Sequence, residues 1–220
     1  MTVLALILAT LASVAHSPPV VPGGCVEPAS GNVGKPGCFL AAEIELARPP
    51  PQLYWHIFEF PGRAEAEQAA SAHRWSRVIE AHGRVWLLAV SDANQAPGTP
   101  RLKAQAGPLA MASRGPVRIR LLESWFPPGM KTRVHAHPGP EIFYVVEGEQ
   151  CVETPTSRAR ITAGETLVVA DGAHLQAAPG GRRSLVLLVV PAGKPWMQLR
   201  DDWQPDGYCD TPGPTVGQRR

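Results

Sequence analysis

The sequence lacks an excess of charge of either sign. It has 21 Lys and Arg residues against 19 Asp and Glu residues, and its formal net charge is +2 at pH 7. The basic residues are scattered, and the only adjacent pairs are Arg182-Arg183 and Arg219-Arg220. A nucleic-acid-binding surface needs a basic patch or stripe. We therefore expect no nucleic-acid partner.

Helix-favouring runs are also scarce, whereas the chain holds 24 prolines and 21 glycines. This combination favours short strands joined by tight turns, as in a β-sandwich or barrel. The hydrophobic fraction of 44% suffices for a core. A length of 220 residues suits one generous domain, or one domain with an extension.

The N-terminal apolar run is too short for a membrane span. Val3–Ala15 falls well below the roughly 20 residues that a span requires, but has the length of a signal-peptide core. Ser13 and Ala15 supply small residues at −3 and −1 of a cleavage site before His16. No basic residue precedes the run, and a buried N-terminal strand or helix is the alternative. We expect residues 1–15 to be a signal peptide and the mature protein to be exported, periplasmic or extracellular, with no stable membrane span after cleavage.

The four cysteines include no C-x-x-C pair, so neither a zinc knuckle nor thioredoxin chemistry is indicated. In an oxidising compartment they would form two disulfides, for which three pairings exist. The local choice is Cys25–Cys38 across a Gly/Pro-rich loop, with Cys151–Cys209 joining the tail to the barrel. The alternative is four free buried thiols in a cytosolic protein.

Residues 16–107 are expected to form an N-terminal region of strands, loops and one short helix. Leu53–Phe60 is an aromatic strand candidate, and residues 61–73 are a short helix candidate. Val78–Glu80 and Val85–Val90 flank His82-Gly83 as a hairpin. The sequence leaves open whether residues 53–90 form a separate lobe or add strands to a barrel.

From Pro116 the turn residues become regular, and residues 108–195 are expected to form the barrel, followed by a tail over residues 196–220. Strands of five to eight residues with turns every eight to twelve are typical of an antiparallel barrel. The fold class is therefore all-β with a small α element. Gly148 is expected to end one strand. The expected strands are Val117–Phe126, Thr132–His137, Glu141–Glu147, Glu149–Thr154, Thr166–Ala170 and Ser184–Pro191.

Two histidines and a carboxylate between Gly129 and Gly148 are the clearest chemical signal. His135 and His137 are two apart, so on a strand they share a face. Residues 138–140 (Pro-Gly-Pro) then place Glu141 at the head of the next strand. Two buried imidazoles are costly unless they form hydrogen bonds or bind metal. This ligand set suits a divalent transition metal such as Fe(II), Mn, Zn, Ni or Cu. The alternative is a hydrogen-bonded histidine pair beside a solvated Glu.

The segment reads G-x5-H-x-H-x3-E-x6-G and resembles the first signature of the cupin superfamily. The second signature, G-x5-P-x-G-x2-H-x3-N, is only partly matched: Ala170 stands at the proline position, the asparagine is absent, and His174 comes one residue early. The resemblance covers roughly residues 108–195. It implies an antiparallel jelly-roll barrel holding a metal through His135, His137, Glu141 and His174. It also allows a homodimer.

The offset of His174 makes its role a separate question. A slip of one residue on a strand turns a side chain to the opposite face. A bulge at Asp171-Gly172 could restore the orientation. The alternative is a histidine at the barrel mouth that contacts substrate or solvent.

Several weaker candidates complete the expected site. Alternation from Val117 puts Ile119, Leu121, Glu123 and Trp125 on one face, which is expected to point inward. Glu123 is then a catalytic candidate that orients a ligand histidine or carries a proton, or else forms a salt bridge at the rim. The candidates for binding substrate are Trp125, Tyr144 and Gln176, with core packing as the alternative for Tyr144. The tail aromatics Trp196, Trp203 and Tyr208 are expected to form a strap over the barrel.

Three functions follow from these features. The first is an exported metalloenzyme acting on a small molecule, which the resemblance suggests to be a dioxygenase, an isomerase or a decarboxylase. The second is a non-catalytic cupin that captures a metal or a small ligand. The third is a structural or secretion-linked scaffold. Because one barrel hosts many functions, the fold does not choose among them.

Overall fold

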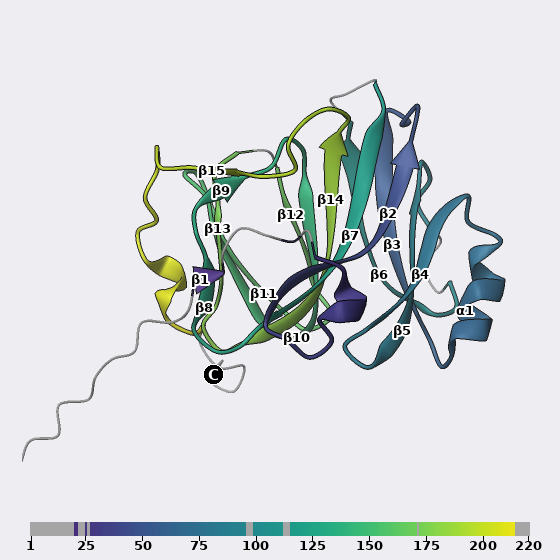
Figure 1. Ribbon diagram of the computed structural model, residues 1–220, viewed down its shortest axis with the longest axis horizontal. Coiled ribbons are helices and arrows are strands. Elements are labelled where there is room, and N and C mark those ends of the chain that lie inside the picture. Colours follow the sequence, from purple (N-terminus) through teal and green to yellow (C-terminus); the bar gives the residue numbers. More distant parts are fainter. Residues whose placement is uncertain are drawn as a thin grey trace, which may run out of the picture.

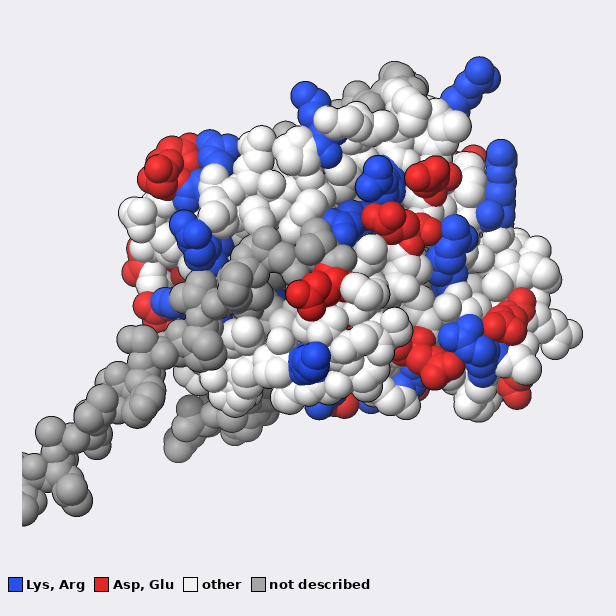
Figure 2. Space-filling view, viewed as in Figure 1, with Lys and Arg blue, Asp and Glu red and all other residues white. Residues whose placement is uncertain are grey.

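A computed structural model of the chain describes residues 20–21, 25, 27–95, 99–111, 115–170 and 172–213. The expected signal peptide and Asp171 lie outside these residues. No helix of the described part is long and apolar enough to cross a membrane. Figure 2 shows basic and acidic side chains interspersed over one face of the molecule.

The described elements confirm the expected all-β class and are arranged in three sheets (Figure 1). The strands are β1 (Val20–Val21), β2 (Gly37–Leu46), β3 (Gln52–Phe60), β4 (Trp75–Ala81), β5 (Arg84–Ser91), β6 (Leu102–Ala110), β7 (Val117–Phe126), β8 (Met130–Thr132), β9 (His135–Ala136), β10 (Glu141–Glu153), β11 (Arg158–Thr162), β12 (Thr166–Val169), β13 (Leu175–Ala178), β14 (Arg182–Pro191) and β15 (Gln198–Leu199). One α-helix, α1 (Arg63–Ala70), contacts strands β3, β4 and β5. The two 3-10 turns are η1 (Ala29–Gly31) and η2 (Tyr208–Asp210).

The barrel is one curled sheet in the order β1-β8-β13-β10-β14-β7-β2, with β11 and β12 also paired to β10. All of its pairings are antiparallel except β1 with β8. Strand β2, from the N-terminal region, pairs with β7 along its whole length and supplies the edge of this sheet. The two-stranded sheet β9-β15 crosses one end of the barrel (Figure 1).

Strand β10 corrects one expectation. Gly148 does not end a strand but lies inside β10, next to a register shift between Val145 and Glu147. Its φ of +79° and the nearby Gly181 carbonyl leave no room for a Cβ. The bulged strand bends there, so its first half pairs with β12 and β14 and its second half with β11 and β13.

The second sheet, in the order β4-β5-β3-β6, answers the question left open about residues 53–90. Its inward residues, among them Trp55, Trp86 and Leu88, share one core cluster with Ile119 and Leu187 of the barrel sheet. The expected hairpin is confirmed, with φ of +53° at His82 and +72° at Gly83, as a two-residue turn requires. The lobe therefore packs on the outer face of the barrel.

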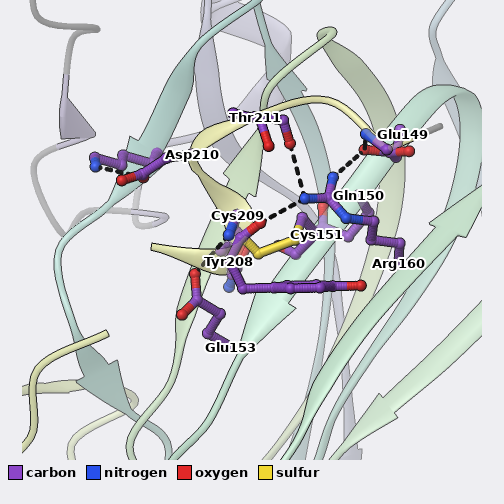
Figure 3. The surroundings of a disulfide bond; sticks show 12 residues. Glu149, Gln150, Cys151, Glu153, Arg160, Tyr208, Cys209, Asp210 and Thr211 are labelled. Carbon is purple, nitrogen blue, oxygen red and sulfur yellow. Dashed lines mark hydrogen bonds and ion pairs between the residues drawn. A yellow bond between two sulfur atoms is a disulfide. The ribbon is translucent and has the colours of Figure 1, made fainter. Parts of the chain in front are cut away.

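Both expected disulfide pairs are present, and no described cysteine is free. The Cys151–Cys209 bridge attaches the tail to β10 (Figure 3). Around it, Glu153 accepts the backbone N–H of Cys209 at 2.7 Å. Arg160 donates to the carbonyls of Tyr208 and Thr211 at 2.6 and 2.7 Å. These contacts fix the end of the tail on the barrel wall.

Candidate metal centre

The four residues that the two signatures single out lie together at one end of the barrel. His135 is in β9, His137 follows it, Glu141 begins β10, and His174 immediately precedes β13. All four are buried, and one potential ligand atom from each lies within 4.8 Å of the others. A metal at about 2.0–2.2 Å from nitrogen or oxygen ligands accommodates ligand atoms up to about 4.4 Å apart. The set therefore needs to contract by only a few tenths of an ångström.

The structure resolves the offset of His174. The backbone N–H of His135 donates to the carbonyl of His174 at 3.0 Å, and the reverse bond is 2.8 Å long. Residues that exchange both bonds in an antiparallel pair are directly opposite, and their side chains share a face. The two ring centroids are accordingly 4.3 Å apart. Gly172, with φ of +124°, precedes this pair.

Each of the three imidazoles is fixed by a backbone carbonyl. Nδ1 of His135 bonds the carbonyl of Arg133 at 2.8 Å, and Nδ1 of His174 bonds that of Gly172 at 3.2 Å. Nδ1 of His137 bonds the carbonyl of Trp196 at 2.7 Å. A carbonyl only accepts, so the proton of each neutral ring is on Nδ1. The Nε2 lone pairs of the neutral rings are then available for a metal.

Two of the three Nε2 atoms lie beside the Glu141 carboxylate, whereas Nε2 of His135 lies 3.5 Å from the amide nitrogen of Gln176. Oε2 of Glu141 lies 3.0 Å from Nε2 of His174 and 3.5 Å from Nε2 of His137. Neither approach has hydrogen-bond geometry, and both Nε2 atoms are buried without a partner. Buried polar atoms without partners are costly and call for an explanation. A metal ion between the rings and the carboxylate would satisfy them together.

The pKa values of the cluster residues are shifted in different directions. Burial, reinforced by His174, lowers the pKa of His135 to about 3. Burial also opposes protonation of His137, but the Glu141 carboxylate outweighs it and raises the pKa of His137. Burial alone would raise the pKa of Glu141, whereas His137 and His174 hold it well below its usual range. Glu141 is thus an anion at neutral pH, as a ligand must be.

A buried polar chain holds Glu141 from behind. The side-chain amide of Gln176 donates to both carboxylate oxygens, at 3.3 and 3.1 Å. Arg182 donates to the Gln176 amide oxygen at 3.2 Å and also to Ser124 at 3.0 Å and to Ser184. Burial lowers the pKa of Arg182 to about 9, so that it stays a cation at neutral pH. The cation is thereby linked through an amide to the carboxylate.

A small cavity of about 40 Å³ adjoins the cluster. It is lined mainly by apolar groups, including Leu122, Phe126, Val186 and Trp196 and the Cys25–Cys38 disulfide. Since a water molecule needs about 10–15 Å³ of such space, the cavity holds a few waters at most. Met197 and Leu199 of the tail complete its wall.

Three predicted site residues lie elsewhere. The expected inward orientation of Glu123 and Trp125 is wrong, since they line a groove outside the barrel with His82 and Arg183. Tyr144 lies in the core between the sheets, edge-on to Trp86 at 5.9 Å. The cause is that the second sheet buries the outer face of the barrel sheet, so alternation alone does not tell the inner face from the outer one. Gln176 does line the cavity, as predicted.

Two residues of the site were missed. Arg182 stands in a Gly-Gly-Arg-Arg run that reads as an exposed turn, yet it is 3% exposed. Its cation lies 3.9 Å from the centroid of the Phe126 ring. Trp196 was expected in a strap, but nothing in the sequence indicated that its carbonyl would hold His137. Only the fold brings these residues to the cluster.

No family model and no curated protein matches the sequence, but solved structures do. A cupin superfamily protein from Desulfitobacterium hafniense is 19% identical with a TM-score of 0.30, over 37% of this chain and 73% of its own. An RmlC-like cupin from Shewanella frigidimarina is 26% identical with a TM-score of 0.31, over 36% and 78%. A DMSP lyase from Ruegeria pomeroyi is 20% identical with a TM-score of 0.33, over 37% and 42%.

These likenesses are too distant to inform on activity or ligand. The chain's own strands form an almost entirely antiparallel barrel, which is the architecture that the resemblance to the cupin signatures implies, and its buried His-His-Glu-His cluster has the residue types of a metal site.

Proposed function

We propose that this protein holds one divalent transition-metal ion through Nε2 of His135, His137 and His174 and the carboxylate of Glu141. The observation that carries the proposal is the set of three Nδ1–H groups bonded to three backbone carbonyls. That arrangement fixes the tautomers and leaves the three Nε2 lone pairs for a metal, with those of His137 and His174 beside the Glu141 carboxylate. A hydrogen-bonded histidine cluster would have no need to leave two buried Nε2 atoms without partners.

Fe(II), Mn, Zn, Ni and Cu all suit such nitrogen and oxygen ligands. When bound, the ion would supply a Lewis acid or a redox centre for a small molecule. The protein's own residues orient the ligands and exclude water. Gln176 holds the carboxylate of Glu141, and Leu122, Phe126 and Val186 keep the adjoining space apolar.

Metal analysis of the purified protein tests this proposal. We expect about one metal ion per wild-type chain and none in the His135→Ala/His137→Ala variant. A Glu123→Gln variant is the matched control, because this carboxylate lies on the outer groove and should leave the metal content unchanged. Wild-type protein that arrives without metal, and takes up none of the five candidates, would refute the proposal.

The chemistry that such an ion supplies supports a second step, in which the metal centre acts on a small molecule. Oxidoreductase or isomerase chemistry fits, because an ion with four protein ligands in octahedral coordination keeps two positions open. Oxygen consumption with phenols, diketones and sugar acids tests this step. A metal-loaded protein that binds members of the panel without turnover would instead be a non-catalytic small-ligand cupin.

We also propose that the protein is exported, to the periplasm or beyond the cell. The two disulfides support this, since such bonds persist in oxidising compartments. Intact mass before and after reduction, on protein from the native host, tests both points. A chain that retains Met1 and has four free thiols would contradict export. Light scattering on the same sample tests the homodimer.

A further inference from the structure

A segment of the tail lies across the end of the barrel that holds the cluster (Figure 1). We call residues 194–200 the strap; of the three tail aromatics expected to cross the barrel, this segment contains Trp196. Within it, β15 pairs with β9, where Leu199 is opposite His135 and Gln198 is opposite Ala136. The Arg200 N–H donates to the carbonyl of Val134 at 3.0 Å. The strap is therefore hydrogen-bonded to the strand that carries the first histidine.

Trp196 connects the strap to the second histidine. Its carbonyl accepts from Nδ1 of His137 at 2.7 Å, and its ring stacks on the imidazole with centroids 5.8 Å apart and planes at 24°. The Arg120 guanidinium lies 4.9 Å from the Trp196 ring centroid. Arg120 is itself held by Glu43 at 3.2 Å and by the carbonyl of Cys25 at 2.8 Å. Barrel residues thus hold the ring in place.

His137 differs from the other two histidines in the origin of the carbonyl that bonds its Nδ1. The carbonyls that fix His135 and His174 belong to residues two positions earlier in the chain, Arg133 and Gly172. The carbonyl that fixes His137 comes from 59 residues away. The orientation of His135 and His174 is therefore built into their own turns, whereas that of His137 depends on the docked strap.

Both ends of the tail segment that contains the strap are anchored. It leaves β14 at Pro191, and it ends at Cys209, which is bonded to Cys151 of β10. Glu153 and Arg160 reinforce the second anchor. Between the anchors most residues are exposed, and β15 forms only a two-residue pairing. The disulfide is thus the covalent element that keeps the strap near the cluster.

We propose that Trp196 is a positioning residue for His137, and that the Cys151–Cys209 bond keeps the strap in place so that the metal is retained. The inference rests on the proposed metal site. It predicts that the affinity for metal depends on a segment that contributes no ligand atom. Loss of a group that orients a metal-bound histidine costs about 10–100-fold in affinity.

The experiment uses Co(II) and Zn(II) with the oxidised protein. Affinity is measured by competition with a chelator, release by stopped flow, and ligand geometry by the visible absorption of bound Co(II). Trp196→Ala keeps the backbone carbonyl but removes the ring that seats it against His137, so we expect about 10-fold weaker binding, faster release and a changed Co(II) spectrum. Trp196→Phe, which keeps a ring on the imidazole, should recover most of the affinity.

Trp125→Ala is the matched control. Trp125 is half-buried like Trp196 and also lies beneath an arginine, with Arg183 at 5.0 Å, but it faces the outer groove. It should leave affinity and spectrum at the wild-type values. The positioning role is refuted if Trp196→Ala and Trp125→Ala behave alike in both measurements.

The Cys151→Ala/Cys209→Ala variant tests the tether while keeping every residue of the cluster and the strap. We expect it to unfold cooperatively and yet release Co(II) about 10-fold faster than wild type. A folded variant with wild-type release kinetics would overturn the tether. Wild-type protein that binds neither metal would instead refute the proposed metal site, which separates the two failures.

Discussion

Replacing Gln176 by leucine should weaken metal binding and destabilise the protein at the same time. The Gln176 amide donates to both oxygens of Glu141 and accepts from Arg182. The three residues are 6%, 4% and 3% exposed. Water therefore cannot replace the lost amide, and leucine has a similar volume but no polar atom.

The magnitude follows from the groups left behind. A hydrogen bond to a charged group contributes about 1.5–3 kcal/mol, and a buried donor without a partner costs about 1–3 kcal/mol. Losing the bond to Glu141 and stranding one Arg182 N–H should lower the free energy of unfolding by about 3–5 kcal/mol. Metal affinity should fall by about 10–100-fold, because the carboxylate loses the group that orients it.

Urea unfolding without metal and chelator competition with Zn(II) measure the two effects separately. Gln150→Leu is the control: Gln150 is fully buried, but its amide oxygen has no partner and its amide nitrogen makes only a 3.5 Å contact with the Cys151 carbonyl. That variant should keep the wild-type metal affinity. If Gln176→Leu and Gln150→Leu bind Zn(II) equally well, the reasoning about the Arg182–Gln176–Glu141 chain is wrong.

Four further predictions follow from the same structure. Free metal at 100 times its Kd should stabilise the fold by about 2.7 kcal/mol. For a chain of this size, this corresponds to a rise of roughly 5–11 °C in Tm. The His135→Ala/His174→Ala variant should show no such rise in a thermal scan. In the metal-free protein, burial lowers the pKa of His135 to about 3 from its ordinary value of 6.5. Between these pH values only the unfolded chain binds this proton, so the free energy of unfolding should fall as the pH drops through this range, and urea titrations should show a flatter pH dependence for His135→Gln. In the chain-entropy model, removing the Cys151–Cys209 bond, with a sequence separation of 58, should lower the free energy of unfolding by about 4 kcal/mol. Removing the Cys25–Cys38 bond, with a separation of 13, should lower it by about 3 kcal/mol. Equal losses measured by chemical denaturation would contradict that ranking. Trp86→Ala should cost about 3–5 kcal/mol in a single cooperative transition, because Trp86 is fully buried between the two sheets; a separate early transition of the second sheet would show that the sheets unfold independently.

Part of the barrel and the His135, His137 and Glu141 members of the cluster could be predicted because their signals are local, although the expected strand Thr132–His137 is divided between β8 and β9 of two different sheets. Strand β7 matches its expected range, Val117–Phe126, residue for residue. The turn at residues 138–140 delivers Glu141 to the start of β10. Strand β6 was missed, because its nine residues include Lys103, Gln105 and the Gly107-Pro108 pair and show no clear alternation. Its pairing with β3 forms it nonetheless, as tertiary context often overrides propensity.

The inner face of β7 could not be predicted, and the reason is physical. Ile119 and Leu121 pack against the second sheet, while Leu122 and Phe126 face the barrel interior. A strand buried on both faces lacks the polar alternation that would mark its outside. The prediction that Glu123 and Trp125 line the cavity depended on which face of β7 was taken as the inner one, and it was wrong for that reason.

The position of His174 shows how a partly matched second signature can still bring its histidine into the cluster. The second signature defines the position of its histidine by the number of residues along the chain. In the structure, the position of His174 is set by its backbone pairing with His135. His174 and His135 exchange both backbone bonds, so the orientation of one ring fixes the side on which the other lies. Gly172, with a φ of +124° that glycine adopts freely, lies two residues before His174. The position of His174 in the cluster therefore depends on its registration with His135 and not on the count of residues along its own strand.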